Sequence, residues 1–214
     1  RLGIAQRLRF KDQRVTLPGE APGTDSLSDL LVGAGFNVSQ RWAFDSVVQY
    51  NQDQQRTVRS TVSGRYSPGP YRTVSMAYRF QRDFSEQVDI GWQWPVAALF
   101  GGSFTPPSRN SQPGPGRWYT VGRLNYSMQD RKMIDTVVGF EYDSCCWIGR
   151  VLLERHQNSI TSAATKLLFK VEFVGFSRLS LGRDPLDSLK EQIPRYRGLR
   201  DGNAATASRF SNYD

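Results

Sequence analysis

Apolar and polar residues alternate with a period of two along most of the chain, and this alternation constrains the fold more than any other feature. Successive side chains of a β-strand point to opposite faces, so the alternation predicts strands with one apolar and one polar face. The apolar positions fall into ten segments: Leu2, Ile4, Leu8 and Phe10; Leu30, Val32, Ala34, Phe36 and Val38; Trp42, Phe44, Val48 and Tyr50; Val58, Val62 and Tyr66; Val74, Met76, Tyr78 and Phe80; Val88, Ile90, Trp92 and Trp94; Trp118, Leu124 and Tyr126; Ile134, Val138, Phe140 and Tyr142; Trp147, Val151 and Leu153; Leu167, Phe169, Val171 and Phe173.

The interleaved positions are rich in ionisable and other polar groups: Arg7, Arg9, Asn37, Arg41, Asp45, Gln49, Arg59, Thr61, Ser63, Arg65, Arg79, Asp89, Gln93, Arg123, Asn125, Asp135, Glu141, Arg150, Glu154, Lys166, Lys170 and Glu172. Two all-β architectures give this pattern. A sandwich buries its apolar face between two sheets, whereas a membrane barrel turns that face to lipid and the polar face to a lumen.

Three details favour the barrel over the sandwich. Each segment is about 9–11 residues long, which suits a tilted strand that crosses a bilayer. Aromatic residues gather near segment ends, as an interfacial girdle requires, and tight turns alternate with longer connections. The low mean hydropathy of −0.52 is compatible with such strands, because half of their residues are polar. We therefore predict an all-β transmembrane antiparallel barrel, with the sandwich as the alternative.

The formal net charge of +8 arises from 28 basic and 20 acidic residues. The arginines are spread along the predicted strands and do not cluster into a groove with regularly spaced aromatics, so nucleic acid is not a predicted partner. An anionic lipid or a phosphorylated glycolipid fits this charge better. No phosphate loop, metal-binding cluster or zinc motif occurs, and no cofactor is predicted.

The remaining segments suggest how the chain is organised. The chain begins at Arg1 inside an alternating segment, and we expect it to be a piece of a longer or processed protein. Residues 98–116 are rich in Pro and Gly and are predicted to be a disordered insert. After Phe173 the alternation stops. Asp184 and Pro185, followed by Leu186, Leu189 and Ile193, predict a short amphipathic helix that ends at Pro194, with a loose tail from residue 198.

The only cysteines, Cys145 and Cys146, are adjacent and lie between two predicted strands. Neighbouring cysteines bond to each other only through a small ring that strains the peptide between them. If they are oxidised, their partners should lie elsewhere, and the chain offers no third thiol. Two buried free thiols are the alternative reading.

Several motifs together resemble the C-terminal part of the LPS-assembly protein LptD family. They are the run Gly139–Arg150 with its Cys-Cys-Trp, the strand Lys166–Phe173, Gly175-Phe176-Ser177, the Asp184-Pro185-Leu186 to Tyr196 tail, Gly91–Pro95 and Gly122–Ser127. The resemblance covers most of residues 1–197 and is strongest over 117–197. The insert 98–116 and the tail after 198 have no counterpart in it.

The resemblance implies a large outer-membrane barrel of Gram-negative bacteria that delivers lipopolysaccharide (LPS) to the outer leaflet. Residues 1–174 would be its last ten strands, with the insert in a periplasmic turn, and residues 175–214 would be a periplasmic tail. The implied partners are LPS, outer-membrane lipid, an LptE-type lipoprotein plug in the lumen, and periplasmic bridge proteins that reach the chain through an N-terminal domain. Cys145 and Cys146 would bond to cysteines of that N-terminal region at the periplasmic end.

The resemblance also implies a site for lipid exit. Residues 165–173 would form the strand that closes against the first strand of the barrel, and the lateral exit would be this seam, with Leu167, Phe169, Val171 and Phe173. Arg123, Arg150, Lys166 and Lys170 on the lumen side would meet LPS phosphates or acidic groups of a plug. The simpler interpretation of each such residue is that it neutralises a lumen acid such as Glu141 or Glu172.

A barrel lipase and a general porin are the rival functions. A barrel lipase would need a serine, a histidine and a group that orients the histidine ring. His156, Asn158 and Ser159 lie within four residues of one another, whereas a working triad is assembled from separate strands. We therefore predict no enzymatic activity. A general porin would also have a charged lumen, but it has no need of a covalent link to another domain.

Overall fold

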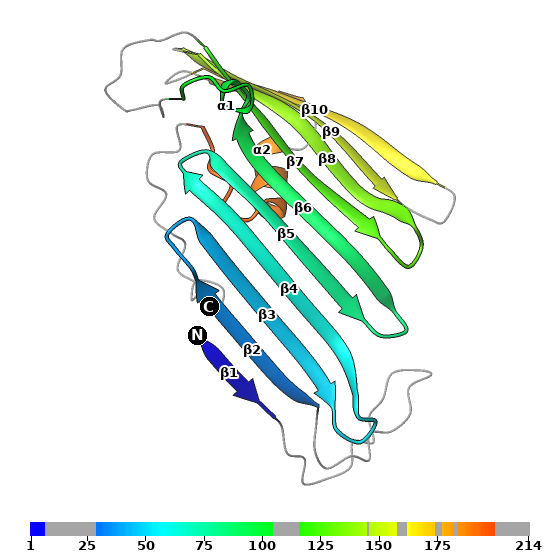
Figure 1. Cartoon of the computed structure of the whole chain (residues 1–214). Coiled ribbons are helices and arrows are strands. Elements are labelled where there is room, and N and C mark those ends of the chain that lie inside the picture. Colours follow the sequence, from blue (N-terminus) through cyan, green and yellow to red (C-terminus); the bar gives the residue numbers. More distant parts are fainter. Residues whose placement is uncertain are drawn as a thin grey trace. The chain divides into compact units, whose positions relative to one another are not determined.

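The computed structural model describes residues 1–6, 29–104, 116–144, 146–157, 162–173, 177–181 and 184–199. Within these ranges the chain forms eleven strands in a single sheet, in which the spatial order follows the chain order from β1 to β11 (Figure 1). Every pairing with a recorded register is antiparallel. The prediction of an all-β antiparallel fold is confirmed.

The elements have these bounds: β1 Leu2–Ala5, β2 Leu30–Asn37, β3 Trp42–Asn51, β4 Arg56–Gly69, β5 Arg72–Gln81, β6 Ser85–Pro95, α1 Val96–Leu99, β7 Arg117–Ser127, β8 Lys132–Asp143, β9 Trp147–Gln157, β10 Ala163–Phe173, β11 Ser177–Leu181 and α2 Pro185–Gln192. Strands β1 to β10 coincide with the ten predicted segments, although positions 7–10 of the first segment lie outside the described residues. No helix in the described part of the chain is both long enough and apolar enough to cross a membrane.

Strand β11 was not predicted from the sequence. The prediction for residues 175–214 was a tail that follows the last strand, but β11 pairs with the Phe169–Phe173 half of β10. The alternation in this strand covers only five residues, which is too short to stand out from a loop. The predicted helix after Phe173 is confirmed as α2. The insert 98–116 lies mostly outside the described residues, and its first residues complete the single helical turn α1.

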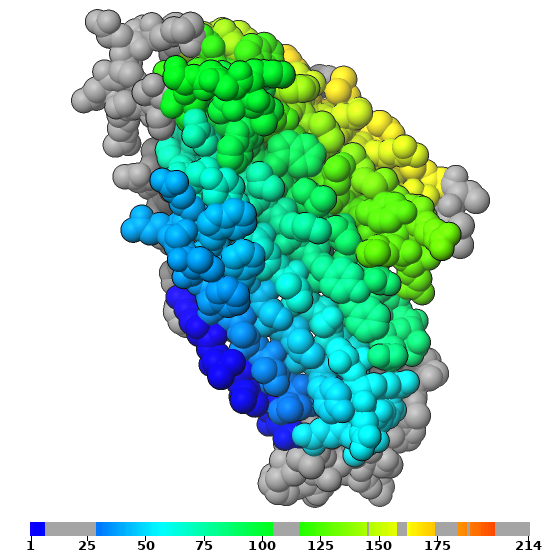
Figure 2. Space-filling model, in the orientation of Figure 1, coloured from blue at the N-terminus to red at the C-terminus, as the bar shows by residue number. Residues whose placement is uncertain are grey.

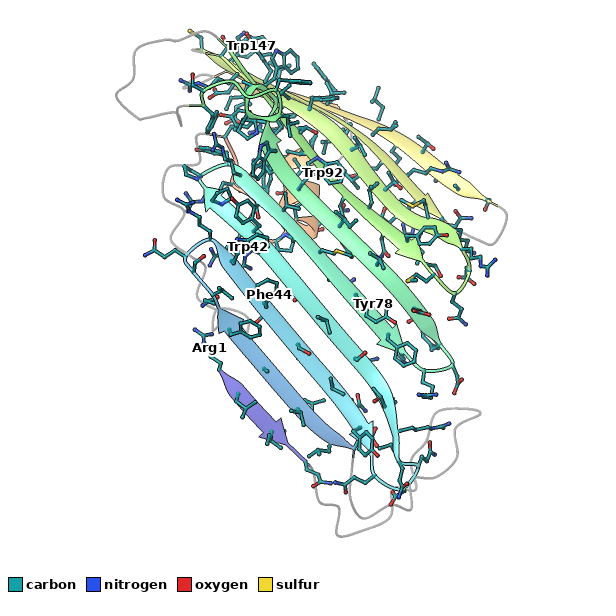
Figure 3. The ribbon with its side chains drawn as sticks, in the orientation of Figure 1. Arg1, Trp42, Phe44, Tyr78, Trp92 and Trp147 are labelled. Atoms are coloured by element: carbon teal, nitrogen blue, oxygen red, sulfur yellow. The ribbon has the colours of Figure 1, made fainter. Side chains whose placement is uncertain are left out.

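The chain divides into two compact units, and the first contains residues 1–68, 75–90 and 125–134. In this unit the register places Phe36 opposite Phe44 and Trp42 opposite Tyr66. The Phe36 and Phe44 ring centroids are 5.4 Å apart, and those of Trp42 and Tyr66 are 4.5 Å apart. Trp42 and Phe44 both lie on β3 (Figure 3), and residues of β2 and β3, in blue, form part of the surface that faces the reader in Figure 2. Aromatic side chains therefore form a ladder near one end of these strands.

The second unit contains residues 69–74, 91–124 and 135–214. Two apolar rows cross its strands β8, β9 and β10: one joins Val138, Leu153 and Leu167, and the other joins Phe140, Val151 and Phe169. We call the side of the sheet that carries these rows the apolar face. Five of these six side chains are among the exposed large hydrophobic residues of the protein. A sandwich would cover them with a second sheet, so the alternative architecture finds no support in the described strands of this unit.

We call the opposite side of these strands the polar face. It carries mainly polar side chains, but it also has a group of apolar side chains that forms the hydrophobic core of this unit. Val121, Val137, Leu152 and Leu168 lie one on each of β7 to β10, and Leu189, Ile193 and Tyr196 of the C-terminal segment pack against them. Helix α2 lies on the far side of the strands in Figure 1. It begins after Asp184, whose side chain accepts a hydrogen bond from the Leu186 N–H, and ends before Pro194, which cannot continue a helix.

Candidate functional site

A row of charged residues crosses the polar face of the second unit. The register places Glu141 of β8 opposite Arg150 of β9, and Arg150 opposite Lys170 of β10. The exposed fraction is 0 % for Glu141, 1 % for Arg150 and 2 % for Lys170. Because taking charges out of water is costly, such groups persist in a structure only when they are paired and hydrogen-bonded.

Arg150 is the centre of this row. Its Nε lies 2.8 Å from Glu141 Oε1, and its Nη1 lies 3.3 Å from Glu172 Oε2. The planar guanidinium therefore joins carboxylates from the two neighbouring strands, β8 and β10, which is a geometry that the point charge of a lysine cannot reproduce. The three strands are thus connected by side chains as well as by the backbone ladder.

Glu141 receives hydrogen bonds from three directions. Besides Arg150, the Tyr196 hydroxyl donates to Oε1 at 2.5 Å, and Gln93 Nε2 donates to Oε2 at 3.4 Å. These donors come from β9, the C-terminal segment and β6. Burial raises the pKa of Tyr196 well above its ordinary value, and the negative charge of Glu141 raises it further, so Tyr196 stays a hydroxyl donor at neutral pH.

Gln93 also binds the backbone of the C-terminal segment. Its Nε2 donates to the Arg197 carbonyl at 2.8 Å, and its Oε1 accepts from the Arg197 N–H at 3.1 Å. A side-chain amide that satisfies both the N–H and the C=O of one residue fixes the position of that residue. Gln93 is fully buried, so loss of this pair would leave its amide short of hydrogen-bond partners away from water.

Lys170 binds the start of the same segment. Its Nζ lies 2.5 Å from Asp184 Oδ2. Partial burial acts to raise the pKa of Asp184, but the hydrogen bonds from Lys170 and from the Leu186 N–H outweigh it, and the pKa lies below its ordinary value. The C-terminal segment Asp184–Leu199 is therefore held to the polar face at both ends by charged or amide side chains and in the middle by apolar packing.

Comparison with known proteins places this arrangement in a family. The family model described as LPS transport system D, LptD, matches residues 1–100. The LPS-assembly protein LptD of Paracidovorax citrulli (strain AAC00-1) is 62 % identical over 216 residues, which cover 100 % of this chain and 26 % of the relative. The LptD protein of Acidovorax sp. (strain JS42) is 58 % identical with the same coverage, and that of Thiobacillus denitrificans is 34 % identical over 91 % of this chain and 24 % of the relative.

The chain belongs to the LptD family. It spans about a quarter of the length of the curated relatives that it matches. The two most similar of these relatives match the whole chain, so the LptD likeness includes the insert 98–116 and the tail after 198, for which the sequence motifs alone gave no counterpart.

The structure separates the four basic residues that were predicted to meet LPS or a plug. In this LptD-family chain Arg150 and Lys170 are buried in ion pairs with Glu141, Glu172 and Asp184. This matches the simpler interpretation, in which they neutralise acids. Lys166 is exposed, and Arg123 is half-buried with its Nη1 3.8 Å from Asp135 Oδ2.

The residues predicted to line the seam lie on β10. Leu167, Phe169 and Phe173 are exposed and Val171 is half-buried, as expected for the apolar face. Strand β10 is not the last strand of the described sheet, however, because β11 pairs with residues 169–173. The other half of β10, Ala163–Leu168, pairs only with β9 among the strands that the structure describes.

The cysteine turn joins β8 and β9. The Ser144 N–H donates to the Trp147 carbonyl at 3.0 Å and closes the hairpin. Cys146 is disulfide-bonded, whereas Cys145 lies outside the described residues. Tyr142 packs against both Trp118 and Trp147, with ring centroids 4.7 and 5.1 Å away, so an aromatic cluster lies beside this turn on the apolar face.

The residues considered for lipase chemistry are not assembled into a site in the described part of the chain. His156 is exposed, with its Nδ1 3.8 Å from Asp135 Oδ1, and Asn158 and Ser159 lie outside the described residues. Groups of His, Cys, Asp and Glu that could hold a metal ion are absent from the described ranges. The contacts of Gln93 and Tyr196 were not predicted from the sequence. Gln93 was recognised only as a polar-face position, and Tyr196 only as part of a motif.

Proposed function

We propose that this chain is the C-terminal part of an outer-membrane barrel that transports LPS and assembles it in the outer leaflet. The observation that carries the proposal is the contrast between the two faces of β8 to β10. One face bears exposed apolar rows, and the other bears the charged row of Glu141, Arg150 and Lys170. Lipid is the solvent that suits the first face, and the relatives that match the whole chain are named LPS-assembly proteins.

The proposed barrel needs more strands than this chain supplies. Strand β1 stands at one end of the strand order and β11 at the other, and each has unpaired backbone groups on its outer side unless another segment covers it. We propose that strands from the N-terminal part of the protein complete the ring. The seam would then lie beside Leu167, in the half of β10 that pairs only with β9 among the described strands, and beside β11 where that strand covers Phe169, Val171 and Phe173, and it would serve as the lateral exit for LPS.

Cys146 is disulfide-bonded in this structure, which contains one other cysteine, Cys145. We propose that in the full-length protein Cys145 and Cys146 bond instead to cysteines of an N-terminal periplasmic region. The periplasm is an oxidising compartment that preserves structural disulfides. A bond that closes a loop of hundreds of residues contributes about 4–5 kcal/mol in the chain-entropy model. This assignment places the cysteine turn and the C-terminal segment at the periplasmic end of the barrel.

The proposed partners follow from this placement. LPS and outer-membrane lipid would meet the barrel directly, an LptE-type lipoprotein would plug its lumen, and periplasmic bridge proteins would dock on the N-terminal domain. Of the four basic residues considered, only Arg123 and Lys166 are proposed to face the lumen contents, because Arg150 and Lys170 are occupied within the chain.

The function is tested by depleting the full-length protein in cells and measuring surface-exposed LPS. We expect surface LPS to fall while LPS accumulates inside the cell and the amount of other outer-membrane proteins at first stays constant. A general porin would instead change only the permeability to small ions and solutes, with normal surface LPS. That outcome would overturn the proposal.

The disulfides have their own test, which is peptide mapping of the full-length protein without reduction. We expect the peptide that contains Cys145 and Cys146 to be linked to two distant N-terminal peptides. An unlinked peptide two hydrogen masses lighter than its reduced form would show that the neighbours are bonded to each other, and an unlinked peptide of full mass would show free thiols. Either result would overturn this part of the proposal.

A further inference from the structure

The C-terminal segment Asp184–Leu199 contacts three separate strands through side chains that are themselves buried. Lys170 of β10 binds Asp184, Glu141 of β8 accepts from Tyr196, and Gln93 of β6 binds the backbone of Arg197. Between these contacts, Leu189 and Ile193 are fully buried against the apolar core of the polar face. The buried polar groups of this segment and of the three strands thereby satisfy one another.

One of these contacts lies close to the cysteine turn. Glu141 is paired with Arg150 across the β8–β9 hairpin, and two further recorded pairs, Tyr142 with Gly149 and Asp143 with Ile148, lie between it and the turn. The Tyr196 hydroxyl therefore reaches the hairpin two residues from its end. Since β8 and β9 are joined by the turn that carries Cys146, a shift of Glu141 relative to Arg150 would move the turn as well.

We propose that the C-terminal segment is a resident occupant of the polar face that holds the cysteine hairpin β8–β9 in place, with Tyr196 as the positioning residue. Tyr196 supplies the only hydrogen bond to Glu141 that comes from the C-terminal segment among the described contacts. Gln93 works in the same direction, because it binds both Glu141 and the residue after Tyr196. Glu141 of the hairpin is therefore bound both by Gln93 of β6 and by Tyr196 of the C-terminal segment.

Two consequences rest on the proposed function. The area of polar face beneath α2 is covered by the chain itself, so neither LPS nor a plug lipoprotein binds there while the segment is docked. The hairpin that bears Cys145 and Cys146 keeps one conformation only while Tyr196 holds Glu141, so the correct disulfides with the N-terminal region form less completely when this contact is lost.

The test is amide hydrogen exchange of the full-length protein in detergent, read in peptides from residues 132–157. In Tyr196→Phe we expect exchange near the turn to be about tenfold faster or more, because a hydrogen bond to a buried charge is lost. Tyr78→Phe is the matched control. It removes a similar hydroxyl-to-carboxylate bond, from Tyr78 to Glu86 at 2.8 Å, on β5. This control should leave exchange in the hairpin unchanged.

A pair of truncations tests the whole segment. A chain that ends at residue 183 lacks the occupant, whereas a chain that ends at residue 199 keeps it. We expect faster hairpin exchange only in the shorter chain. The idea is overturned if Tyr196→Phe exchanges like the wild type in the hairpin, whether or not the shorter truncation folds.

Disulfide mapping of the same variants separates this inference from the proposed function. Faster hairpin exchange in Tyr196→Phe, together with a smaller fraction of correctly linked cysteines, supports both. Faster exchange in a protein whose wild type shows no links to the N-terminal region overturns the proposed disulfides and leaves the positioning role of Tyr196 intact. Equal exchange with normal links overturns the positioning role alone.

Discussion

Arg150 of β9 and Glu141 of β8 face each other at directly paired positions, with 2.8 Å between Nε and Oε1, and both are buried from solvent. A buried ion pair is no guarantee of stability, since desolvation of the two charges opposes their attraction. The pair does constrain substitutions, because a buried charge needs its partner. When one of the two charged residues is retained, the other must be retained as well.

The first prediction concerns the removal of one partner of this pair. Arg150→Met should lower the free energy of unfolding by about 3–5 kcal/mol, because it leaves Glu141 buried without its cation. The double variant Glu141→Gln, Arg150→Met should be less destabilised than the single variant, because it also removes the unpaired charge of Glu141. Lys170 is then the one charged residue left in the row. The measurement is urea unfolding of the full-length protein in detergent, followed by circular dichroism.

Arg79→Met is the control for this experiment. Arg79 Nη1 lies 3.1 Å from Asp89 Oδ2, but the Arg79 side chain is 47 % exposed. The Asp89 side chain is 11 % exposed, so only one partner of this pair is buried, and the loss should be clearly smaller than for Arg150→Met. Equal losses for Arg79→Met and Arg150→Met would show that burial of the Glu141 row has no energetic effect.

The second prediction concerns a close approach of backbone and side chain at Gly139. A Cβ atom at this position would lie 2.3 Å from both the Val151 carbonyl oxygen and Leu152 Cδ2. Because one of these atoms belongs to the backbone, the clash cannot be relieved by a rotamer change alone. Gly139→Ala should cost about 1–3 kcal/mol in the same unfolding measurement. Gly69→Ala is the control, since a Cβ there meets nothing within 4 Å and should be tolerated.

The strands and their two faces were predictable because a period of two is a direct consequence of strand geometry. The C-terminal contacts were not, because they pair residues that are far apart in sequence, such as Gln93 and Arg197. One signal was available. Val121 and Leu152 are apolar at interleaved positions of the polar face, and apolar residues there need a cover, which the predicted helix with Leu189 and Ile193 supplies.

The fate of Lys170 illustrates the same limit. Its position on the polar face was predicted from alternation, but its partner, Asp184, belongs to a segment that the alternation does not reach. Alternation assigns a side chain to a face and carries no information on what covers that face. A lysine next to an open lumen and a lysine beneath α2 therefore look identical in sequence.

The third prediction concerns the pH dependence of the Lys170–Asp184 contact. The pKa of Asp184 is lowered from 3.8, so the folded state favours the carboxylate more than the unfolded chain does. The resulting stabilisation is fully present above about pH 5 and is lost as the pH falls below 3.8 through the folded-state pKa. Asp184→Asn keeps the helix cap but removes the charge, so its unfolding midpoint should lie below that of the wild type at pH 7 and converge with it at low pH.

Asp184→Ala extends this experiment, because it removes the cap of α2 as well. It should lose about 0.5–2 kcal/mol more than Asp184→Asn, by an amount that does not depend on pH. A constant difference between the wild type and Asp184→Asn from pH 7 to pH 3 would contradict the assignment of the charge effect to Asp184.

The fourth prediction concerns the solvent of the apolar face. Leu153 is 49 % exposed and lies between Val138 and Leu167, whereas its neighbour Glu154 is on the polar face. If hydrocarbon covers the first side, Leu153→Lys should cost about 2–4 kcal/mol and lower the amount of folded, heat-resistant protein in the outer membrane and of LPS at the cell surface. Glu154→Lys introduces the same side chain one position away and should leave both quantities near the wild-type level. Equal tolerance of the two lysines would mean that water meets both faces of β9, and the membrane placement of this sheet would be wrong.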